Sequence, residues 1–256
     1  MFDAITLADA VTLFSEDPSG TEKQYGVMNC WNVSQVTYMV YLFSGLTFNE
    51  NISCWDVSQV IDMAGMFSDS SFNSDIANWN VAKVKDTSYM FSDAYSFNQT
   101  LNSWNVGNVE SMDGMFMNAP KFDSPLDKWN VSSVVSMYLM FMNAKSFNRP
   151  LSTWNVAKVQ FMNYMFSNAT SFNQDLDKWL LDWVEIDGMF SSAIKFNGNV
   201  SSWNVAKVTN MTSLFENAYS FNRPLGKWNV SQVLDFDYMF SSTPFNPKHF
   251  TLENKT

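Results

Sequence analysis

Tryptophan recurs along this chain at an almost constant interval, and this period limits the fold more than any other feature of the sequence. Nine of the ten tryptophans lie 24 or 25 residues apart, and Trp183 alone falls outside the series. A fixed period of this length is typical of repeat proteins, in which each unit buries its apolar side against its neighbours. The sequence therefore predicts a single array of about nine stacked units. The series runs Trp31, Trp55, Trp79, Trp104, Trp129, Trp154, Trp179, Trp203 and Trp228.

Other apolar residues share the phase of the tryptophans. The consensus unit is L-x-x-W-N-V-x-x-V-x-x-M-x-x-M-F-x-x-A-x-x-F-N, and 18 of the 23 phenylalanines lie at its two phenylalanine positions. The Trp-Asn-Val segment alternates apolar and polar residues, which is typical of a short strand. The spacing of three or four residues from Val to Ala is typical of a helix or helical turn. We therefore predict an α/β repeat solenoid with short parallel strands on one face and short helices or helical turns on the other.

The chain divides into three predicted segments. Residues 1–26 are expected to form an N-terminal capping helix and loop, residues 27–247 the nine-repeat solenoid, and residues 248–256 a C-terminal tail. The unit that starts near Trp179 reads W-L-L-D-W-V, so it lacks the consensus Asn and one residue. A local bulge or kink is expected there.

The expected capping helix has an apolar face. Leu7, Val11 and Phe14 have helical spacing, and Thr6-x-x-Asp9 resembles the capping box at a helix start. The acidic segment that begins at Glu16 contains Pro and Gly and would end this helix. Such a helix would cover the open first unit of the array.

Composition and charge exclude several classes of function. The formal net charge is −10, so nucleic-acid binding is not expected from a chain that repels phosphate. No apolar run approaches the roughly 18 residues that a membrane span needs, and no signal peptide is visible at the N-terminus. We therefore expect no membrane insertion.

The sequence offers no catalytic, cofactor or metal site. It contains one histidine, His249, close to its end, and no H-E-x-x-H, C-x-x-C, P-loop or G-x-G-x-x-G motif. A nucleophilic triad would have to be built on that single histidine. We therefore expect a protein that is not an enzyme and that needs no cofactor.

Polar residues flank each repeated tryptophan and form the candidate binding strip. The Asn between Trp and Val would point outward from a strand, where it either bonds to its copies in neighbouring strands or binds a partner, and both roles are compatible. Lysines occupy two further fixed positions; they either favour an acidic partner or simply solvate the sheet face. The strip comprises Asn80, Lys83, Asn105, Lys128, Asn130, Asn155, Lys158, Lys178, Asn204, Lys207 and Lys227.

Two other repeated positions have structural interpretations. The Asn that follows the second consensus Phe, such as Asn148, lies where the chain turns back and is expected to bond to backbone groups of the turn. Cys30 and Cys54 share one phase in consecutive units, so their Cα atoms would lie about 5 Å apart, within reach of a disulfide. The sequence leaves open whether they form a disulfide or remain two thiols.

The repeat resembles that of the BspA-like surface proteins, a relative of leucine-rich repeats that includes mycoplasma lipoprotein-type 25-residue repeats. The resemblance rests on W-N/D-V-S-x-V, M-x-x-M-F and S-F-N-x-x-L and covers about residues 25–246. It implies a cell-surface or extracellular location, adhesion and contact with other proteins. Because no export or lipid-attachment signal is visible, an intracellular or assembly-bound location stays open.

These observations predict a non-enzymatic protein-binding or adhesion module that uses the concave strand face. One alternative is a structural subunit of a larger assembly, joined through the edge or flank of the solenoid. Another is glycan binding by the polar strip. The partner would be another protein with an acidic surface, or a glycan. An exposed edge at the last unit also allows end-to-end self-association.

Overall fold

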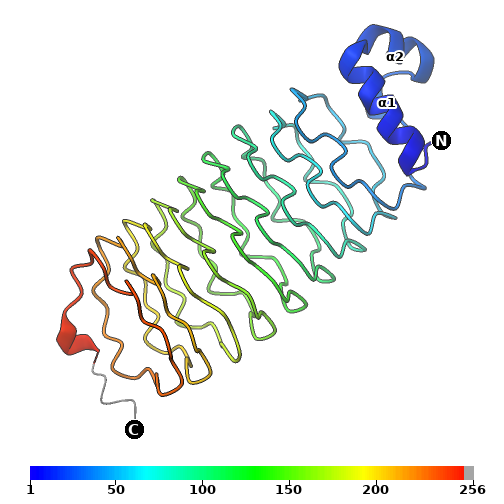
Figure 1. Cartoon of the computed structure of the whole chain (residues 1–256). Coiled ribbons are helices and arrows are strands. Elements are labelled where there is room, and N and C mark those ends of the chain that lie inside the picture. The colour runs from blue at the N-terminus through cyan, green and yellow to red at the C-terminus, as the bar shows by residue number, and fades with distance from the viewer. Residues whose placement is uncertain (251–256) are drawn as a thin grey trace.

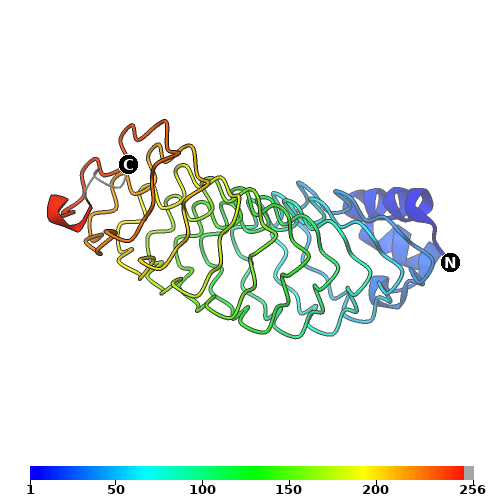
Figure 2. The same cartoon turned by 90° about the horizontal axis from the view of Figure 1, so that it is seen from below.

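The repeats stack side by side into one elongated body, with the N-terminal helices at one end and the last unit at the other (Figures 1 and 2). This computed structural model describes residues 1–250. Most of the expected C-terminal tail, residues 251–256, lies outside the described residues.

The N-terminal cap contains two α-helices, α1 (Ala4–Glu16) and α2 (Pro18–Tyr25). Helix α1 buries Leu7, Val11 and Phe14, as its spacing predicts, and it ends at Glu16. Its capping box is formed by Asp3 and Thr6, not by the Thr6-x-x-Asp9 segment. Helix α2 lies where a loop was expected; it begins at a proline, a residue favoured in the first helical turn.

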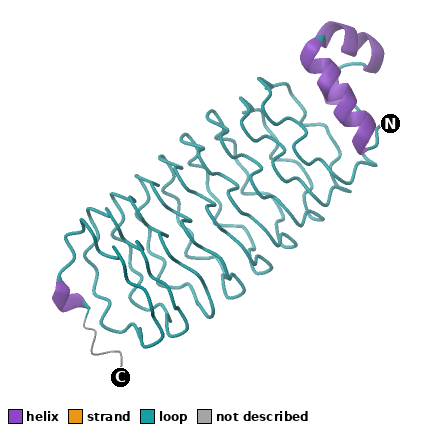
Figure 3. Ribbon diagram, viewed as in Figure 1, coloured by secondary structure: helices purple, strands orange, loops and turns teal. Residues whose placement is uncertain are grey.

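The predicted α/β class is wrong. Within residues 1–250 there is no β-strand, and both α-helices belong to the cap (Figure 3). The other helical segments are two single 3₁₀ turns, η1 (Met28–Cys30) and η2 (Pro247–His249). Neighbouring units are joined by isolated parallel bridges, such as Ser111 to Ser136 and Ser136 to Phe161. The candidate strip therefore does not lie on a sheet.

Consecutive tight turns replace the expected strand and helix in each unit. In the unit from Leu126 to Pro150, the amide of Met140 donates to the carbonyl of Met137 at 3.2 Å. Leu139 and Asn143 have φ of 58° and 59°, in the left-handed region. Because residues of this conformation interrupt both extended and right-handed helical backbone, neither regular element can continue through the segment.

The remaining backbone amides of the same segment pair with the next unit. The amides of Leu139, Phe141 and Asn143 donate to carbonyls 24 residues further on, at 3.1, 2.8 and 2.8 Å. Alternate amides are thus used inside a turn and between units. This arrangement satisfies the backbone of a buried segment without regular secondary structure.

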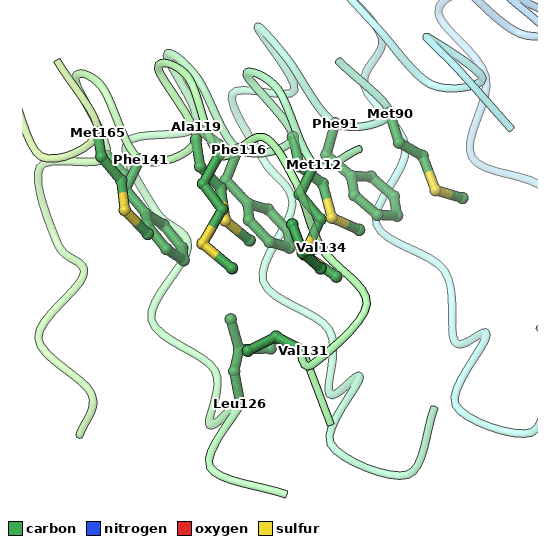
Figure 4. Close-up of a cluster of buried hydrophobic side chains, with 14 of the residues drawn as sticks. Met90, Phe91, Met112, Phe116, Ala119, Leu126, Val131, Val134, Phe141 and Met165 are labelled. Atoms are coloured by element: carbon green, nitrogen blue, oxygen red, sulfur yellow. The ribbon is translucent and has the colours of Figure 1, made fainter. Parts of the chain in front are cut away.

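The core is a set of parallel ladders of identical side chains. The ring centroids of Phe116 and Phe141 are 5.6 Å apart, and the indoles of Trp154 and Trp179 stack at 6.4 Å (Figure 4 shows the phenylalanine ladder). Each repeated tryptophan also bonds to the backbone; Trp129 Nε1 donates to the carbonyl of Leu101 at 2.8 Å. The prediction that tryptophan, phenylalanine and methionine form the scaffold of the array is confirmed.

The seventh unit is interrupted where the sequence departs from the consensus. Elsewhere the V-x-x-V turn is closed by a hydrogen bond such as Val134 to Val131 at 3.0 Å; within residues 1–250 the equivalent bond from Val184 to Leu181 is missing. The series of isolated bridges also breaks between Glu185 and Asn210. The sequence predicts a bulge or kink near Trp179, and the structure has a break in the turn and bridge pattern there.

Candidate functional site

The asparagines of the predicted strip are exposed, but they do not bond to one another. The Oδ1 atom of Asn130 accepts the amide of Ser132 at 3.2 Å, two residues further along the chain. The same bond recurs at Asn80, Asn105, Asn155 and Asn204. Each Asn therefore stabilises the turn that follows its own Trp-Asn-Val segment. The interpretation of these residues as a ladder between strands is wrong.

The ladder of asparagines lies instead at the Phe-Asn position. The Oδ1 atom of Asn148 accepts the amide of Asn173 in the next unit at 2.9 Å. Asn49, Asn73, Asn98, Asp123, Asn173, Asn197 and Asn222 do the same. The prediction that this position satisfies turn backbone groups is confirmed, although the amides belong to the following unit.

The six lysines of the candidate strip are exposed at the two corners that flank each Trp-Asn-Val segment. We define the Trp-Asn-Val strip as the side chains directly before and after each repeated tryptophan, and the two that separate the consensus valines. Its charged residues are six lysines, Asp56 and Asp182, so it has a net charge of +4 on a chain with net charge −10. Asp127 and Asp177, just outside it, reduce this local excess.

Two of these lysines already have partners within the protein. Lys83 Nζ donates to Gln59 Oε1 at 2.6 Å, and Lys207 forms an exposed ion pair with Asp182 at 2.6 Å. Exposed pairs of this kind stabilise a protein little, so both lysines stay accessible to a partner.

The interrupted seventh unit places two apolar side chains in the middle of this polar strip. Leu180 stands where other units have Asn and is 73% exposed; Trp183 stands at a lysine position and is 48% exposed. Leu180 has no side-chain oxygen to accept the amide of Asp182, so the seventh unit lacks the bond that supports this turn in the units with Asn. The ring of Trp183 meets that of Phe161 edge-on, with centroids 6.3 Å apart.

A shallow groove of about 240 Å³ runs beside Trp183. Its walls are Val135, Ala157, Lys158, Gln160, Asp182 and Trp183. In the sequence, Leu180 and Trp183 are recognisable only as a departure from the repeat. The signal that identifies them as a surface feature is that both fall at consensus positions whose side chains point outward.

A second surface is formed by the outward side chains on the turns between the second consensus Val and the consensus Ala of each unit. We call this surface the turn face. It carries eleven carboxylates and one lysine, Lys85, which pairs with Glu110 at 3.0 Å. Six of the nine tyrosines also lie on it. The acids are Asp62, Asp69, Asp86, Asp93, Glu110, Asp113, Glu185, Asp187, Glu216, Asp235 and Asp237.

Burial perturbs the ionisation of several groups on the turn face. It raises the pKa of Asp113, and the Asp86 carboxylate adds to this rise, while hydrogen bonds from Ser136 and Tyr138 oppose it. Burial also raises the pKa of Tyr89, with a further rise from Asp113. Tyr164 shows the same pattern, with Asp187 as the neighbouring carboxylate that raises its pKa.

Cys30 and Cys54 are exposed free thiols in this structure. Asn29 links the two units here: its Oδ1 accepts the amide of Cys54 at 2.9 Å, and its Nδ2 donates to Cys54 Sγ at 3.4 Å. A disulfide in an oxidising compartment stays a prediction.

The last unit exposes an apolar pocket of about 640 Å³, with Phe236, Phe240, Phe245 and Phe250 among its walls. His249 packs edge-on against Phe245 and lies outside the strip. Among residues 1–250, no three His, Cys, Asp or Glu side chains converge as metal ligands. No helix in the same range is long and apolar enough to span a bilayer.

The chain matches the model of a protein family over most of its length. The model of the family described as "Mycoplasma protein of unknown function, DUF285" matches residues 12–123, 100–186 and 182–253 in tandem. Together these overlapping matches cover residues 12–253, which include the whole array. No curated protein matches the sequence.

Proposed function

We propose that this chain, which belongs to the Mycoplasma protein family of unknown function DUF285, is a non-enzymatic protein-binding module. Its binding surface is the Trp-Asn-Val strip, centred on Leu180 and Trp183. The exposure of these two side chains, at positions that are polar in the other units, is the observation that supports the proposal.

Trp183 has the properties of an anchor residue. Tryptophan is enriched among residues that dominate binding energy, and such residues are surrounded by contacts that exclude water. The groove beside Trp183 offers apolar walls at Val135 and Ala157 next to the ammonium group of Lys158. A partner segment with an apolar side chain and a nearby carboxylate would match this combination.

The lysines around the anchor favour an acidic partner. Lys158, Lys178 and Lys207 lie in the sixth, seventh and eighth units, on both sides of Trp183. Lysines at the rim of an interface mainly accelerate association and exclude partners of the wrong charge. They are expected to set the salt dependence of binding, while Leu180 and Trp183 set its strength.

The resemblance to BspA-like repeats supports a further part of the proposal, a role in adhesion at the cell surface. Labelling intact cells with a membrane-impermeant reagent tests this location. Label on Lys128 or Lys178, both exposed, is expected only if the strip faces the exterior.

The binding proposal is tested by restoring the polar consensus at the anchor. We expect the double variant Leu180→Asn/Trp183→Lys to retain its fold. Its affinity for a captured partner should fall at least about 30-fold, because anchor residues contribute about 2 kcal/mol or more to the binding free energy. The immobilised protein is exposed to solubilised proteins of the native organism, and the captured proteins are quantified by mass spectrometry.

The matched control is Tyr219→Lys, which makes the same kind of change at an exposed aromatic residue outside the strip. It should capture the same proteins as the unmodified chain. If the double variant captures them equally well, the strip is not the binding surface.

Glycan binding is a second candidate, because Trp183 is an exposed aromatic ring of the kind that stacks on sugars. A glycan array probed with the same variants separates the candidates: binding that is lost with Trp183→Lys and insensitive to salt would favour a glycan over an acidic protein.

A further inference from the structure

At one position of the turn face a tyrosine is followed by a glycine in the next unit three times, and the rings fit against the glycines. Only the last two pairs have a carboxylate next to the glycine; the three pairs are Tyr41 with Gly65, Tyr89 with Gly114, and Tyr164 with Gly188. Tyr89 in the third unit is followed at the same position of the fourth unit by Gly114, and Tyr164 is followed by Gly188. A Cβ atom on Gly114 would lie 2.5 Å from Cδ1 of Tyr89, and one on Gly188 would lie 2.2 Å from Cε1 of Tyr164. Each ring therefore lies directly against the backbone of the following glycine.

A carboxylate accompanies each of these two rings. Asp113 and Asp187 directly precede the glycines, so they lie in the unit over which the ring extends. The charge of Asp113 contributes to the raised pKa of Tyr89, and that of Asp187 to the raised pKa of Tyr164. The backbone amides of Tyr89 and Tyr164 donate to the carbonyls of Asp113 and Asp187 at 2.6 and 3.0 Å, so each ring and its carboxylate belong to directly paired residues of neighbouring units.

The protein holds both carboxylates in place. Asp113 Oδ1 accepts the amide of Tyr138 at 3.0 Å and a hydrogen bond from the Ser136 hydroxyl. Asp187 Oδ1 accepts a hydrogen bond from the side-chain amide of Asn163. All of these donors are neutral. The hydrogen bonds therefore hold the carboxylates in place without neutralising their charge.

The surrounding field favours a cationic ligand. The turn face carries eleven carboxylates and only Lys85, as counted above. Such a surface concentrates cations and accelerates their association. Tyrosine rings add an attraction that is specific for cations, because the face of an aromatic ring is electrostatically negative.

We propose that Tyr89 with Asp113, and Tyr164 with Asp187, are two subsites for arginine or lysine side chains, and that the turn face docks a basic peptide segment. A guanidinium or ammonium group would lie over the tyrosine ring and bond to the neighbouring carboxylate. This surface is separate from the Trp-Asn-Val strip, so the proposal does not depend on the function proposed above.

The spacing of the subsites defines the ligand. They are three units apart, which is about 15 Å at the usual separation of paired backbones. An extended peptide covers this distance in four or five residues. The preferred ligand therefore has two cationic residues separated by three or four others.

Synthetic peptides test this spacing directly. One peptide has two arginines separated by four Gly or Ser residues, a second has two adjacent arginines, and a third has citrulline at both positions of the first. We expect isothermal titration calorimetry at fixed ionic strength to show the first peptide binding most tightly. Equal affinity for the first two peptides would overturn the two-subsite arrangement.

Variants of the protein test the residues. Tyr89→Leu and Tyr164→Leu should each weaken the first peptide about three- to tenfold, because they remove the aromatic face but no charge. Asp113→Asn and Asp187→Asn should weaken it by a similar factor. The control Tyr95→Leu changes an exposed tyrosine outside these subsites and should leave the affinity unchanged.

If the aspartate variants weaken binding while both tyrosine variants bind as the unmodified protein does, attraction is purely electrostatic and the proposal is overturned. Circular dichroism melts show whether each variant is folded. If Tyr89→Leu does not fold, Tyr89→Phe tests the same residue: it keeps the ring, so it should keep the peptide affinity, and a loss of affinity would overturn binding over the ring face.

Discussion

Replacing Gly114 with alanine probes the contact between neighbouring units on the turn face. Gly114 has φ of 53°, and a Cβ atom there would lie 2.5 Å from two carbons of the Tyr89 ring. The left-handed conformation costs a residue with a Cβ atom about 1–2 kcal/mol. Displacing the ring adds about 1 kcal/mol, at the low end of the cost of overpacking, because Tyr89 is only half-buried. We therefore expect Gly114→Ala to lower the free energy of unfolding by about 2–3 kcal/mol.

A double-mutant cycle with Tyr89→Ala separates the two contributions. In the background without the ring, Gly114→Ala should cost only the conformational term of about 1–2 kcal/mol. The coupling energy between the two positions should therefore be about 1 kcal/mol. Urea unfolding followed by tryptophan fluorescence measures all four proteins, with the m-value checked because long repeat arrays can lose two-state behaviour.

The matched control is Gly107→Ala. Gly107 lies at a position where three other units have alanine, and its backbone is not in the left-handed region. This change should be neutral or stabilise the protein by about 0.4–1 kcal/mol. A coupling energy within about 0.3 kcal/mol of zero would show that Tyr89 does not lie against Gly114, and would remove the geometric basis of the proposed cation subsites.

Three further changes test other parts of the structure. Trp129→Phe leaves the buried carbonyl of Leu101 without its indole donor and should lower the free energy of unfolding by about 1–3 kcal/mol in urea titrations; a loss below about 0.5 kcal/mol would show that this bond matters little. Leu180→Asn restores an acceptor for the turn of the seventh unit and should raise the free energy of unfolding by about 0.5–1 kcal/mol. The gain should appear as a higher midpoint of thermal unfolding. An unchanged midpoint would mean that the missing residue, not Leu180, prevents the turn. Asp113→Asn should stabilise the protein at pH 7. Burial raises the pKa of the Asp113 carboxyl in the folded state, so the free energy of unfolding falls as the pH increases above 3.8, the usual pKa of an aspartate. The advantage of the variant should vanish below that pH, and a constant difference across the titration would contradict the argument.

The repeat, its length and its core can be predicted from the sequence alone. The tryptophans and phenylalanines mark the period, and both ladders are buried as expected, except that Phe240 and Phe245 of the last unit are partly exposed. The apolar face of α1 was also predictable, because its spacing is that of a helix. These features follow from which side chains must leave water, and this is readable from apolar periodicity alone.

The backbone conformation of each unit depends on contacts between units, which the sequence does not reveal. Apolar residues three and four apart suit a helical turn, and they suit a chain of tight turns equally well. What selects the turns is the hydrogen bonding of Leu139, Phe141 and Asn143 to the next unit, 24 residues away. Local propensity does not contain this information, because the bonds exist only when the units stack.

The candidate surfaces divide in the same way. The lysines and asparagines of the Trp-Asn-Val strip were identified from their phase, and the structure shows them exposed. The roles of the two asparagine positions were visible only in three dimensions, because one bonds within its unit and the other to the next. The contact of Tyr89 with Gly114 likewise joins residues 25 positions apart. Periodicity shows which residues share a row, but hydrogen bonds and steric fit between adjacent rows depend on stacking, and stacking is a property of the folded array.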